Sequence, residues 1–265
     1  MKHNNLLCYE NYEVFQDKNS EKKYKELKLF SSNPHVNFIK KIFDNKRIEI
    51  LELGSGNSKT LFNLSINNLL INAYGVEISK SRYEFAEKWK EELNATDVIN
   101  INDDFLNLSK YSFPKFDLVF CVDIAFQFCE PIKFNSEIKL LKEIFYLLKE
   151  SGKLILELDG LGRILKSIES NTKLWEEFDN DDPWQYSLWD CSYNNQSNIL
   201  VWEKIFIHRL EHFRDRKKVE LKIYNKETIQ KLLEDVGFKK INFFSNWDFS
   251  ELKDDSDNFI VVCEK

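Results

Sequence analysis

The chain has 265 residues, of which 43% are apolar and 14% aromatic, enough to bury the core of one α/β domain with an added segment. Its formal net charge of −6 argues against a nucleic-acid backbone as the main partner, because phosphates are neutralised by a cationic surface. No apolar run approaches the ~18 residues that cross a membrane, no signal-peptide pattern is present, and the five cysteines form no Cys-x-x-Cys pair. We therefore expect a cytoplasmic protein with no membrane segment and no bound metal.

Residues 1–45 predict a helical cap. Helical patterns occupy Lys22–Phe30 and Pro34–Phe43. Asn33 is the predicted N-cap of the second helix, with Pro34 at its first position, because proline lacks an N–H that the first turn leaves unpaired in any case.

The segment from Ile48 to Ser58 carries the most informative pattern in the chain. Ile48–Leu53 predicts a buried strand, which then turns through Gly54 and Gly56, two of only seven glycines. Such a loop at the start of a helix lets backbone N–H groups approach a nucleotide-like ligand without interference from a Cβ. A Gly-x-Gly turn after a strand occurs in sites for NAD, FAD and S-adenosylmethionine, and also in plain turns, so this pattern alone leaves all of these open.

Four further strands are predicted after this loop, and each ends in polar groups on what would be one edge of a sheet. They are Ile71–Glu77, Val98–Asn102 with Asp103 and Asp104 next, Phe116–Asp123, and Lys153–Leu158. Glu77 stands about twenty positions after Gly56, where a doubly wound fold places the acid that binds ribose hydroxyls.

Helices are predicted between these strands at Lys59–Asn67, Ser79–Leu93 and Phe134–Leu148. Ser151 and Gly152 are typical of a helix C-terminus. The alternation of strand and helix predicts a parallel sheet with right-handed crossovers.

The pattern changes after residue 160. Two short apolar runs, Ile199–His208 and Val219–Tyr224, flank the charged stretch Arg214–Lys218 and predict an antiparallel hairpin with a solvated tip. The earlier pattern then returns: Asn225 caps a predicted helix Lys226–Val236, Gly237 ends it, and Lys239–Phe244 and Asn258–Cys263 are predicted strands.

Taken together, these motifs resemble those of the class I S-adenosylmethionine (SAM)-dependent methyltransferases that act on small molecules. The likeness rests on Glu52–Ser58, on Glu77, on Asp104, on Phe116–Asp123 and on Leu147–Leu154, and it covers about residues 46–160 before resuming near the C-terminus. It implies an α/β fold with a seven-stranded, mostly parallel, doubly wound sheet of order 3-2-1-4-5-7-6, strand 7 being antiparallel, and helices on both faces. The implied parts are an N-terminal helical cap (1–45), a SAM-binding core (46–160), an inserted antiparallel β lid (161–225) and the closing helix and strands (226–265).

The resemblance also implies SAM as the cofactor and S-adenosyl-L-homocysteine (SAH) as its product. Ser58 departs from the family pattern, which usually has a third glycine there. Glu52 disfavours a nicotinamide cofactor, since a pyrophosphate fits poorly beside a carboxylate, whereas a sulfonium and an ammonium are cations. The residues implied in cofactor binding are Tyr12, Glu52, Gly54, Ser55, Gly56, Ser58, Glu77, Ile78, Asp104, Phe105, Val122 and Asp123.

The sequence identifies catalytic and substrate-binding residues less well than cofactor-binding ones. Methyl transfer mainly requires alignment of the acceptor, exclusion of water and sometimes removal of a proton. Asp123 at the tip of the fourth strand is one candidate, with a loop carboxylate or helix cap as the alternative. His208, in a strand-like run, is a second, with a packed structural histidine as the alternative. Candidates for substrate binding, each with a structural alternative, are Gln127, Glu157, Trp184 and Tyr186.

The function predicted is methyl transfer to the oxygen or nitrogen of a small polar metabolite, such as a sugar, a sugar nucleotide or another biosynthetic building block. We expect a small-molecule acceptor, no nucleic-acid or membrane partner, and a monomer or homodimer. One alternative is a nucleic-acid methyltransferase, disfavoured by the acidic charge and by Val122–Ala125 in place of Asn-Pro-Pro-Tyr. Another is an inactive SAM-binding partner subunit, disfavoured by the acids Glu52, Glu77 and Asp104.

Overall fold

The computed structural model describes residues 10, 12–15, 17–160, 168, 173–180, 182–209, 214–253 and 258–265. Residues 1–9 of the predicted N-terminal cap lie outside the described residues, as does most of the connection from 161 to 172. No helix among those described is long and apolar enough to cross a membrane.

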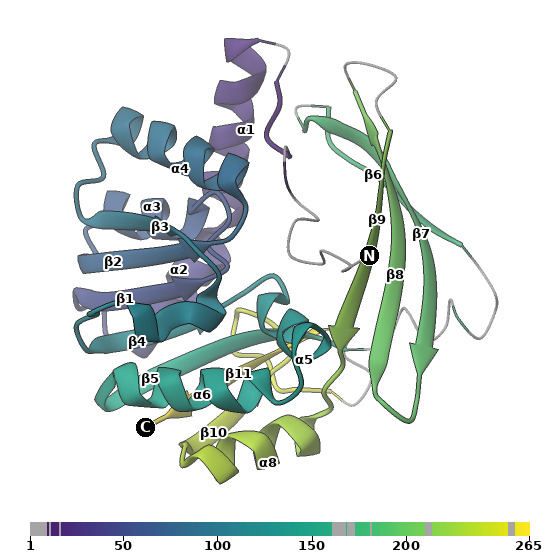
Figure 1. Ribbon diagram of the computed structural model, residues 1–265. Helices are drawn as coiled ribbons and strands as arrows, with labels where there is room; N and C mark the ends of the chain where they lie inside the picture. Colours follow the sequence, from purple (N-terminus) through teal and green to yellow (C-terminus); the bar gives the residue numbers. More distant parts are fainter. Residues whose placement is uncertain are drawn as a thin grey trace.

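The core is a seven-stranded sheet of order β10-β11-β5-β4-β1-β2-β3, so the predicted strand order is confirmed (Figure 1). Strands β1 to β5 are parallel to one another, while β11 runs antiparallel to both β5 and β10. Alternation of side chains along the strands gives the sheet two buried faces. The strands are β1 (Ile48–Leu53), β2 (Leu70–Glu77), β3 (Val98–Asn102), β4 (Phe116–Cys121), β5 (Leu148–Asp159), β10 (Lys239–Phe244) and β11 (Asn258–Glu264).

Helices cover both faces of this sheet. One face, which includes Ile50, packs against α1 (Lys18–Ser31), α2 (Asn33–Ile42), α3 (Lys59–Ile66) and α4 (Lys80–Leu93). The opposite face, which includes the next residue Leu51, packs against the 3₁₀ helix η2 (Phe105–Lys110), α6 (Ser136–Leu147) and α8 (Lys226–Val236). The short helices η3 (Ala125–Phe128) and α5 (Cys129–Ile132) follow β4.

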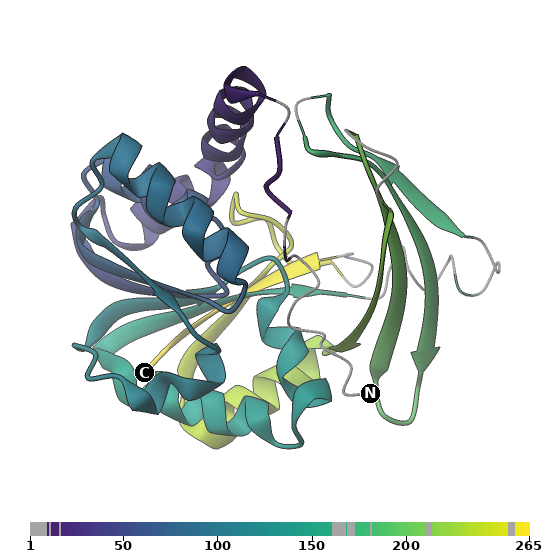
Figure 2. The ribbon, with the colours of Figure 1, turned by 45° about the horizontal axis from the view of Figure 1, so that its top comes forward.

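A second, antiparallel sheet of order β6-β7-β8-β9 follows β5 in the chain, and we call it the lid sheet. Its strands are β6 (Leu174–Glu177), β7 (Trp184–Asn194), β8 (Ile199–His208) and β9 (Arg214–Lys222). Figures 1 and 2 show it standing apart from the core sheet, with its concave face turned toward the core and toward the N-terminal segment that descends from α1. The sequence predicted only the hairpin at 199–224 and missed β6 and β7.

The predicted hairpin tip at Arg214–Lys218 is wrong. These residues form the first half of β9, where Arg216 pairs with Ile205 and Lys218 with Glu203. The run was interpreted as a turn because all of its residues are charged, so it shows no alternation of apolar and polar residues. That alternation becomes visible only at Val219 and Leu221, further along the same strand. Between the end of β8 at His208 and the start of β9, residues 210–213 lie outside the described residues.

Two predicted helix termini are also corrected. Helix α6 ends at Leu147, and Ser151 and Gly152 lie within β5 instead of at a helix C-cap. A Cβ at Gly152 would lie 3.0 Å from the carbonyl oxygen of Phe116, so glycine is needed there for close approach of two backbones. The N-cap of α2 is Ser32, and Asn33 is the first helical residue.

The closing helix agrees with its prediction. Asn225 and Thr228 form a reciprocal capping box at the start of α8. Gly237 ends the helix with φ +114°, a conformation that favours glycine.

Candidate functional site

The glycine loop joins β1 to α3 at the carboxyl edge of the core sheet. Gly54 (φ +71°) and Gly56 (φ +57°) both adopt left-handed conformations, and so does Ser58 (φ +60°). A Cβ added to Gly54 would lie 2.8 Å from the Cβ of Ala125, and one added to Gly56 would lie 2.7 Å from Nη2 of Arg82. The loop therefore requires small residues both for its backbone conformation and for its packing.

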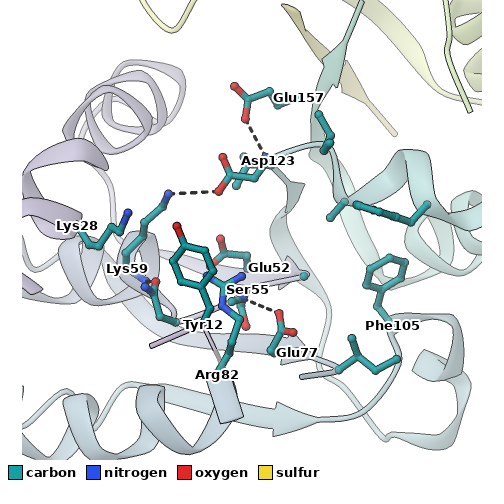
Figure 3. Close-up of a pocket in the computed structure, with 18 of the residues that line it drawn as sticks. Tyr12, Lys28, Glu52, Ser55, Lys59, Glu77, Arg82, Phe105, Asp123 and Glu157 are labelled. Atoms are coloured by element: carbon teal, nitrogen blue, oxygen red, sulfur yellow. Dashed lines mark hydrogen bonds and ion pairs between the residues drawn. The ribbon is translucent and has the colours of Figure 1, made fainter. Parts of the chain in front are cut away.

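Glu77, at the end of β2, ties this loop to the next crossover. One carboxylate oxygen accepts a hydrogen bond from the Gly56 N–H and the other from the Ser79 N–H, each at 2.8 Å. Ser79 is the N-cap of α4. The two backbone donors hold the Glu77 carboxylate in one orientation at the side of the glycine loop (Figure 3).

Glu52 presents a buried carboxylate next to the same loop. Its side chain is 2% exposed, and its Oε2 atom has no hydrogen-bond partner in the part of the chain that the structure describes. Burial raises the pKa of Glu52 well above its ordinary value, partly offset by the positive charge of Lys59. A buried carboxyl group of this kind would be stabilised by a cationic ligand.

Asp123 follows β4 and, unlike Glu52, forms an ion pair. Lys59 Nζ lies 3.2 Å from its Oδ2 atom, and this ammonium holds the pKa of Asp123 well below its usual range. The backbone N–H of Asp123 donates to Glu157 Oε2 at 2.9 Å, and Trp247 Nε1 donates to the other Glu157 oxygen at 3.1 Å. Burial, and then the charge of Asp123, raise the pKa of Glu157.

The backbone after β4 is strained. Asp123 (φ +51°) and Ile124 (φ +60°) are both left-handed, which is costly for a β-branched residue such as isoleucine. Strain of this kind persists where surrounding contacts over-determine the conformation, and it is concentrated at functional sites. The hydrogen bond from Asp123 N–H to Glu157 is one such contact.

These groups surround one cavity of about 550 Å³ between the core sheet and the lid sheet. Figure 3 shows acids and bases from several elements pointing into it, including Glu52, Glu77, Arg82 and Lys59. Its full lining is Tyr12, Tyr24, Lys28, Glu52, Gly54, Ser55, Gly56, Asn57, Lys59, Glu77, Ile78, Arg82, Phe105, Val122, Asp123, Ile124, Ala125, Phe128, Glu157, Glu176, Trp189, Trp202, Lys204 and Asn258.

The N-terminal segment closes one side of the cavity. The hydroxyl of Tyr12 donates to Asp182 Oδ1 at 3.5 Å, and its ring centroid lies 5.9 Å from that of Trp184. The neighbouring Glu13 pairs with Arg82 Nε at 3.2 Å. This segment therefore connects α4 of the core to the start of β7 in the lid sheet.

Comparison with known proteins now identifies the family. Residues 44–237 match the family model described as a methyltransferase domain. The chain belongs to this family. No curated protein matches the sequence.

Solved structures similar to this methyltransferase share its fold at low identity. They include an S-adenosylmethionine-dependent methyltransferase from Clostridium acetobutylicum ATCC 824 (TM-score 0.71, 19% identity, 86% of this chain and 89% of that chain). The CcbJ methyltransferase from Streptomyces caelestis has a TM-score of 0.71 at 14% identity, with 88% of each chain covered. CalS10, an amino pentose methyltransferase from Micromonospora echinaspora, has a TM-score of 0.64 at 12% identity, covering 96% of this chain and 100% of that chain.

The methyltransferase uses SAM as its cofactor, and the cavity suits this molecule. Ribose hydroxyls are donors that match the oriented carboxylate of Glu77, and the ammonium or sulfonium of SAM matches the buried carboxyl of Glu52. The left-handed glycine loop leaves no Cβ between the backbone and such a ligand. Bound SAM supplies a methyl group already activated by its sulfonium.

Two predicted cofactor residues do not line the cavity of the methyltransferase. Ser58 is fully buried and donates its hydroxyl to Asn100 Oδ1 at 2.7 Å. Asp104 caps η2 by accepting from the Leu106 N–H at 2.8 Å, while its neighbour Phe105 lines the cavity. The other ten predicted cofactor residues all line it, though their contacts with SAM stay predictions.

Four predicted catalytic or substrate residues also lie away from the cavity. Gln127 is fully buried and joins η3 to β5, its Nε2 donating to the Asp159 carbonyl at 3.1 Å. Tyr186 faces outward and donates to Glu177, and His208 packs edge-on against Trp184 at 5.1 Å. None of Gln127, Trp184, Tyr186 and His208 lines the cavity. Their contacts are those expected of residues with a structural role, which the sequence analysis gave as the alternative for each.

Several cavity residues escaped the sequence analysis. Lys59 opens α3 directly after the glycine loop, and its place in the chain could have suggested a role. Trp202 and Lys204 come from the lid sheet, where period-2 alternation defines two faces but does not say what either face contacts. Trp189 also lines the cavity, and it lies in the aromatic and acidic segment 181–190 that the sequence suggests as a substrate wall or as a seam between the inserted segment and the core. Lys28 and Arg82 lie on α1 and α4. Both helices contain many charged residues, so nothing in the sequence distinguishes these two as cavity residues.

Replacing Lys59 with methionine tests the electrostatics at Asp123. Because Lys59 depresses the folded-state pKa of Asp123, the ion pair contributes its full stabilisation of the fold above the ordinary aspartate pKa of about 3.9. This stabilisation is lost as pH falls through the lowered folded-state pKa. In Lys59→Met, the pKa of Asp123 is expected to rise toward that ordinary value. A pH titration of the Asp123 carboxyl carbon by NMR measures it.

The exposed Lys46 provides a control, because Lys46→Met removes the same charge at the α2–β1 connection and is expected to leave the Asp123 titration unchanged. If Asp123 titrates identically in the wild type and in Lys59→Met, the ion pair does not control its charge.

Proposed function

We propose that this enzyme transfers the methyl group of SAM to an oxygen or nitrogen of a small polar metabolite, such as a sugar, a sugar nucleotide or a related building block. The observation that carries the proposal is the cavity of about 550 Å³ bounded by both the glycine loop and the lid sheet. A space walled on both sides suits a small acceptor, since SAM itself fills much of it. CalS10 and KedS8, both similar in fold, are described as an amino pentose methyltransferase and a sugar N-methyltransferase.

We assign a role to each segment of the chain according to its position around the cavity. Residues of the core (46–160) bind SAM through Glu52, the glycine loop and Glu77. The inserted segment (161–225) acts as the substrate lid, with the N-terminal cap (1–45) closing the side through Tyr12. The closing elements (226–265) complete the core sheet.

In this proposal Asp123 orients the acceptor. A carboxylate whose pKa is held low by Lys59 is a weak base, but it remains ionised and can accept a hydrogen bond from an acceptor hydroxyl or ammonium. Glu157, with a raised pKa, holds the strained Asp123 backbone through the N–H that it accepts. Transfer then needs an in-line approach of the acceptor lone pair to the sulfonium methyl, with water excluded by the lid.

Two experiments in sequence test the proposal. SAH is expected to raise the thermal unfolding midpoint, and absence of stabilisation at saturating SAH would contradict a functional cofactor site. SAM with a labelled methyl group is then incubated with amino sugars, sugar nucleotides and total RNA. We expect label in a small-molecule product.

The two alternative functions give different results in the same assay. Label found only in RNA would indicate a nucleic-acid methyltransferase. Binding of SAH without transfer to any acceptor class would favour an inactive partner subunit.

A further inference from the structure

The loop 245–251, between β10 and β11, contacts the wall of the cavity through the side chain of Trp247. The indole Nε1 of Trp247 donates to Glu157 Oε1 at 3.1 Å, although the two residues are 90 positions apart in the chain. Glu157 lines the cavity, whereas Trp247 does not. Trp247 therefore contacts a cavity residue from outside the space that a ligand would occupy.

Helix α2 of the N-terminal cap holds the indole ring of Trp247 in place. The ring centroid lies 4.3 Å from that of His35 and 5.2 Å from that of Phe38, which it contacts edge-on. Phe249, from the same loop, stacks on Phe38 with the ring centroids 4.1 Å apart. Because aromatic packing on α2 fixes both the loop and the ring, the indole N–H is held in one direction.

The Glu157 carboxylate joins this indole to the backbone of Asp123. Its Oε2 atom accepts the Asp123 N–H at 2.9 Å (Figure 3), while its Oε1 atom accepts the Trp247 N–H. Since each oxygen has its own donor, the position of the indole constrains the hydrogen bond to Asp123. The backbone of Asp123 is left-handed (φ +51°), a conformation that depends on such surrounding contacts.

The charge state of Glu157 depends on the same contacts. Burial and the negative charge of Asp123 raise the pKa of Glu157, whereas the N–H groups of Asp123 and Trp247 and the charge of Lys59 lower it. His35, packed on Trp247, adds no charge at neutral pH, because burial lowers its pKa to about 4. An ionised carboxylate is the stronger acceptor for the Asp123 N–H, so the Trp247 N–H favours the form of Glu157 that holds this backbone.

We propose that Trp247 is a positioning residue for methyl transfer, which holds Glu157 in the orientation that keeps the Asp123 backbone left-handed and its carboxylate at the cavity. This inference rests on the proposed function, in which Asp123 orients the acceptor. It extends that function to a residue outside the cavity lining. It also gives the contact between α2 and the loop 245–251 a role in the reaction.

The test replaces Trp247 with phenylalanine, which removes the indole N–H and keeps an aromatic ring beside Phe38. NMR is recorded on the full chain saturated with SAH. In Trp247→Phe the pKa of Glu157 should rise, because a hydrogen bond that stabilises its ionised form is lost. The Asp123 amide proton should exchange with solvent at least about fivefold faster, because its acceptor is no longer held by a second donor.

A double-mutant cycle distinguishes an action through Glu157 from a general loosening of the fold. In a Glu157→Gln background, Trp247→Phe should have little further effect on exchange of the Asp123 amide. Trp175→Phe is the matched control, since it removes an indole N–H from an exposed position on β6 and should leave Glu157 and Asp123 unchanged. Trp247→Leu also lacks the N–H and gives a second reading if Trp247→Phe does not fold.

SAH affinity and methyl transfer are measured on the same proteins. Trp247→Phe should keep the SAH dissociation constant within about twofold. It should slow label transfer from SAM to a mixture of amino sugars and sugar nucleotides at least about tenfold, because misplaced aligning groups retard transfer strongly. Absence of transfer by the wild type would contradict the proposed function, while the Glu157 and Asp123 measurements would still decide this inference. An unchanged Glu157 titration, unchanged Asp123 exchange or a normal transfer rate in Trp247→Phe would overturn it.

Discussion

Replacing Glu77 with alanine is expected to weaken SAH binding by between about tenfold and a thousandfold. A carboxylate that accepts both ribose hydroxyls makes two charge-assisted hydrogen bonds, each worth roughly 1.5–3 kcal/mol. The structure adds a second cause, since Glu77 also accepts the N–H groups of Gly56 and Ser79. Removing the Glu77 carboxylate therefore releases the backbone of the glycine loop, in addition to removing the hydrogen bonds to the ribose. Isothermal titration calorimetry with SAH measures the effect.

Two comparisons sharpen this experiment. Glu91→Ala removes a carboxylate from an exposed position on α4 and should leave the SAH dissociation constant unchanged. Glu77→Gln keeps one acceptor oxygen and should bind with intermediate affinity. An unaltered dissociation constant in Glu77→Ala would show that the ribose does not bind at the end of β2.

Substitution of Gly56 by valine is expected to abolish SAH binding while the protein still folds. A Cβ at this position would lie 2.7 Å from Nη2 of Arg82, and φ of +57° is costly for a β-branched residue. Arg82 is a flexible side chain and can move aside, so the lasting consequence is a branched side chain in the space where the cofactor approaches the loop. Titration with SAH and thermal unfolding of the same sample measure binding and stability separately.

Gly237→Val is the matched control. Gly237 also has positive φ, +114°, but it ends α8 on the far side of the core and does not line the cavity. This variant should lower the unfolding midpoint and leave the SAH dissociation constant unchanged. If Gly56→Val binds SAH normally, the cofactor does not lie against the glycine loop.

The local sequence determined much of the core. The capping box at Asn225 and the helix end at Gly237 depend on interactions within a few residues, so the sequence predicts them directly. The strand Ile48–Leu53 pairs with the distant strands β2 and β4, but its mainly aliphatic run is typical of a buried strand. The order of the seven strands followed from the alternation of strand and helix together with the family resemblance. The error at Gly152 arose because close approach to Phe116, on a strand more distant in sequence, decided the conformation. The error at Arg214–Lys218 arose because a run of charged residues was interpreted as a turn, although it pairs with the preceding strand β8.

The part of the cavity lined by the core sheet could be predicted from sequence, because parallel strands bring their carboxyl ends to one edge. Glu52, Gly54, Gly56 and Glu77 each stand at such an end, so their sequence spacing already implied proximity. The part lined by the lid sheet could not be predicted in this way. Trp189, Trp202 and Lys204 reach the cavity only because the lid sheet curves its inner face toward the core, and strand alternation marks two faces without saying which one is covered. Only the tertiary packing places the lid sheet across the cavity from Asp123, because these residues are far apart in the sequence and no local pattern links them.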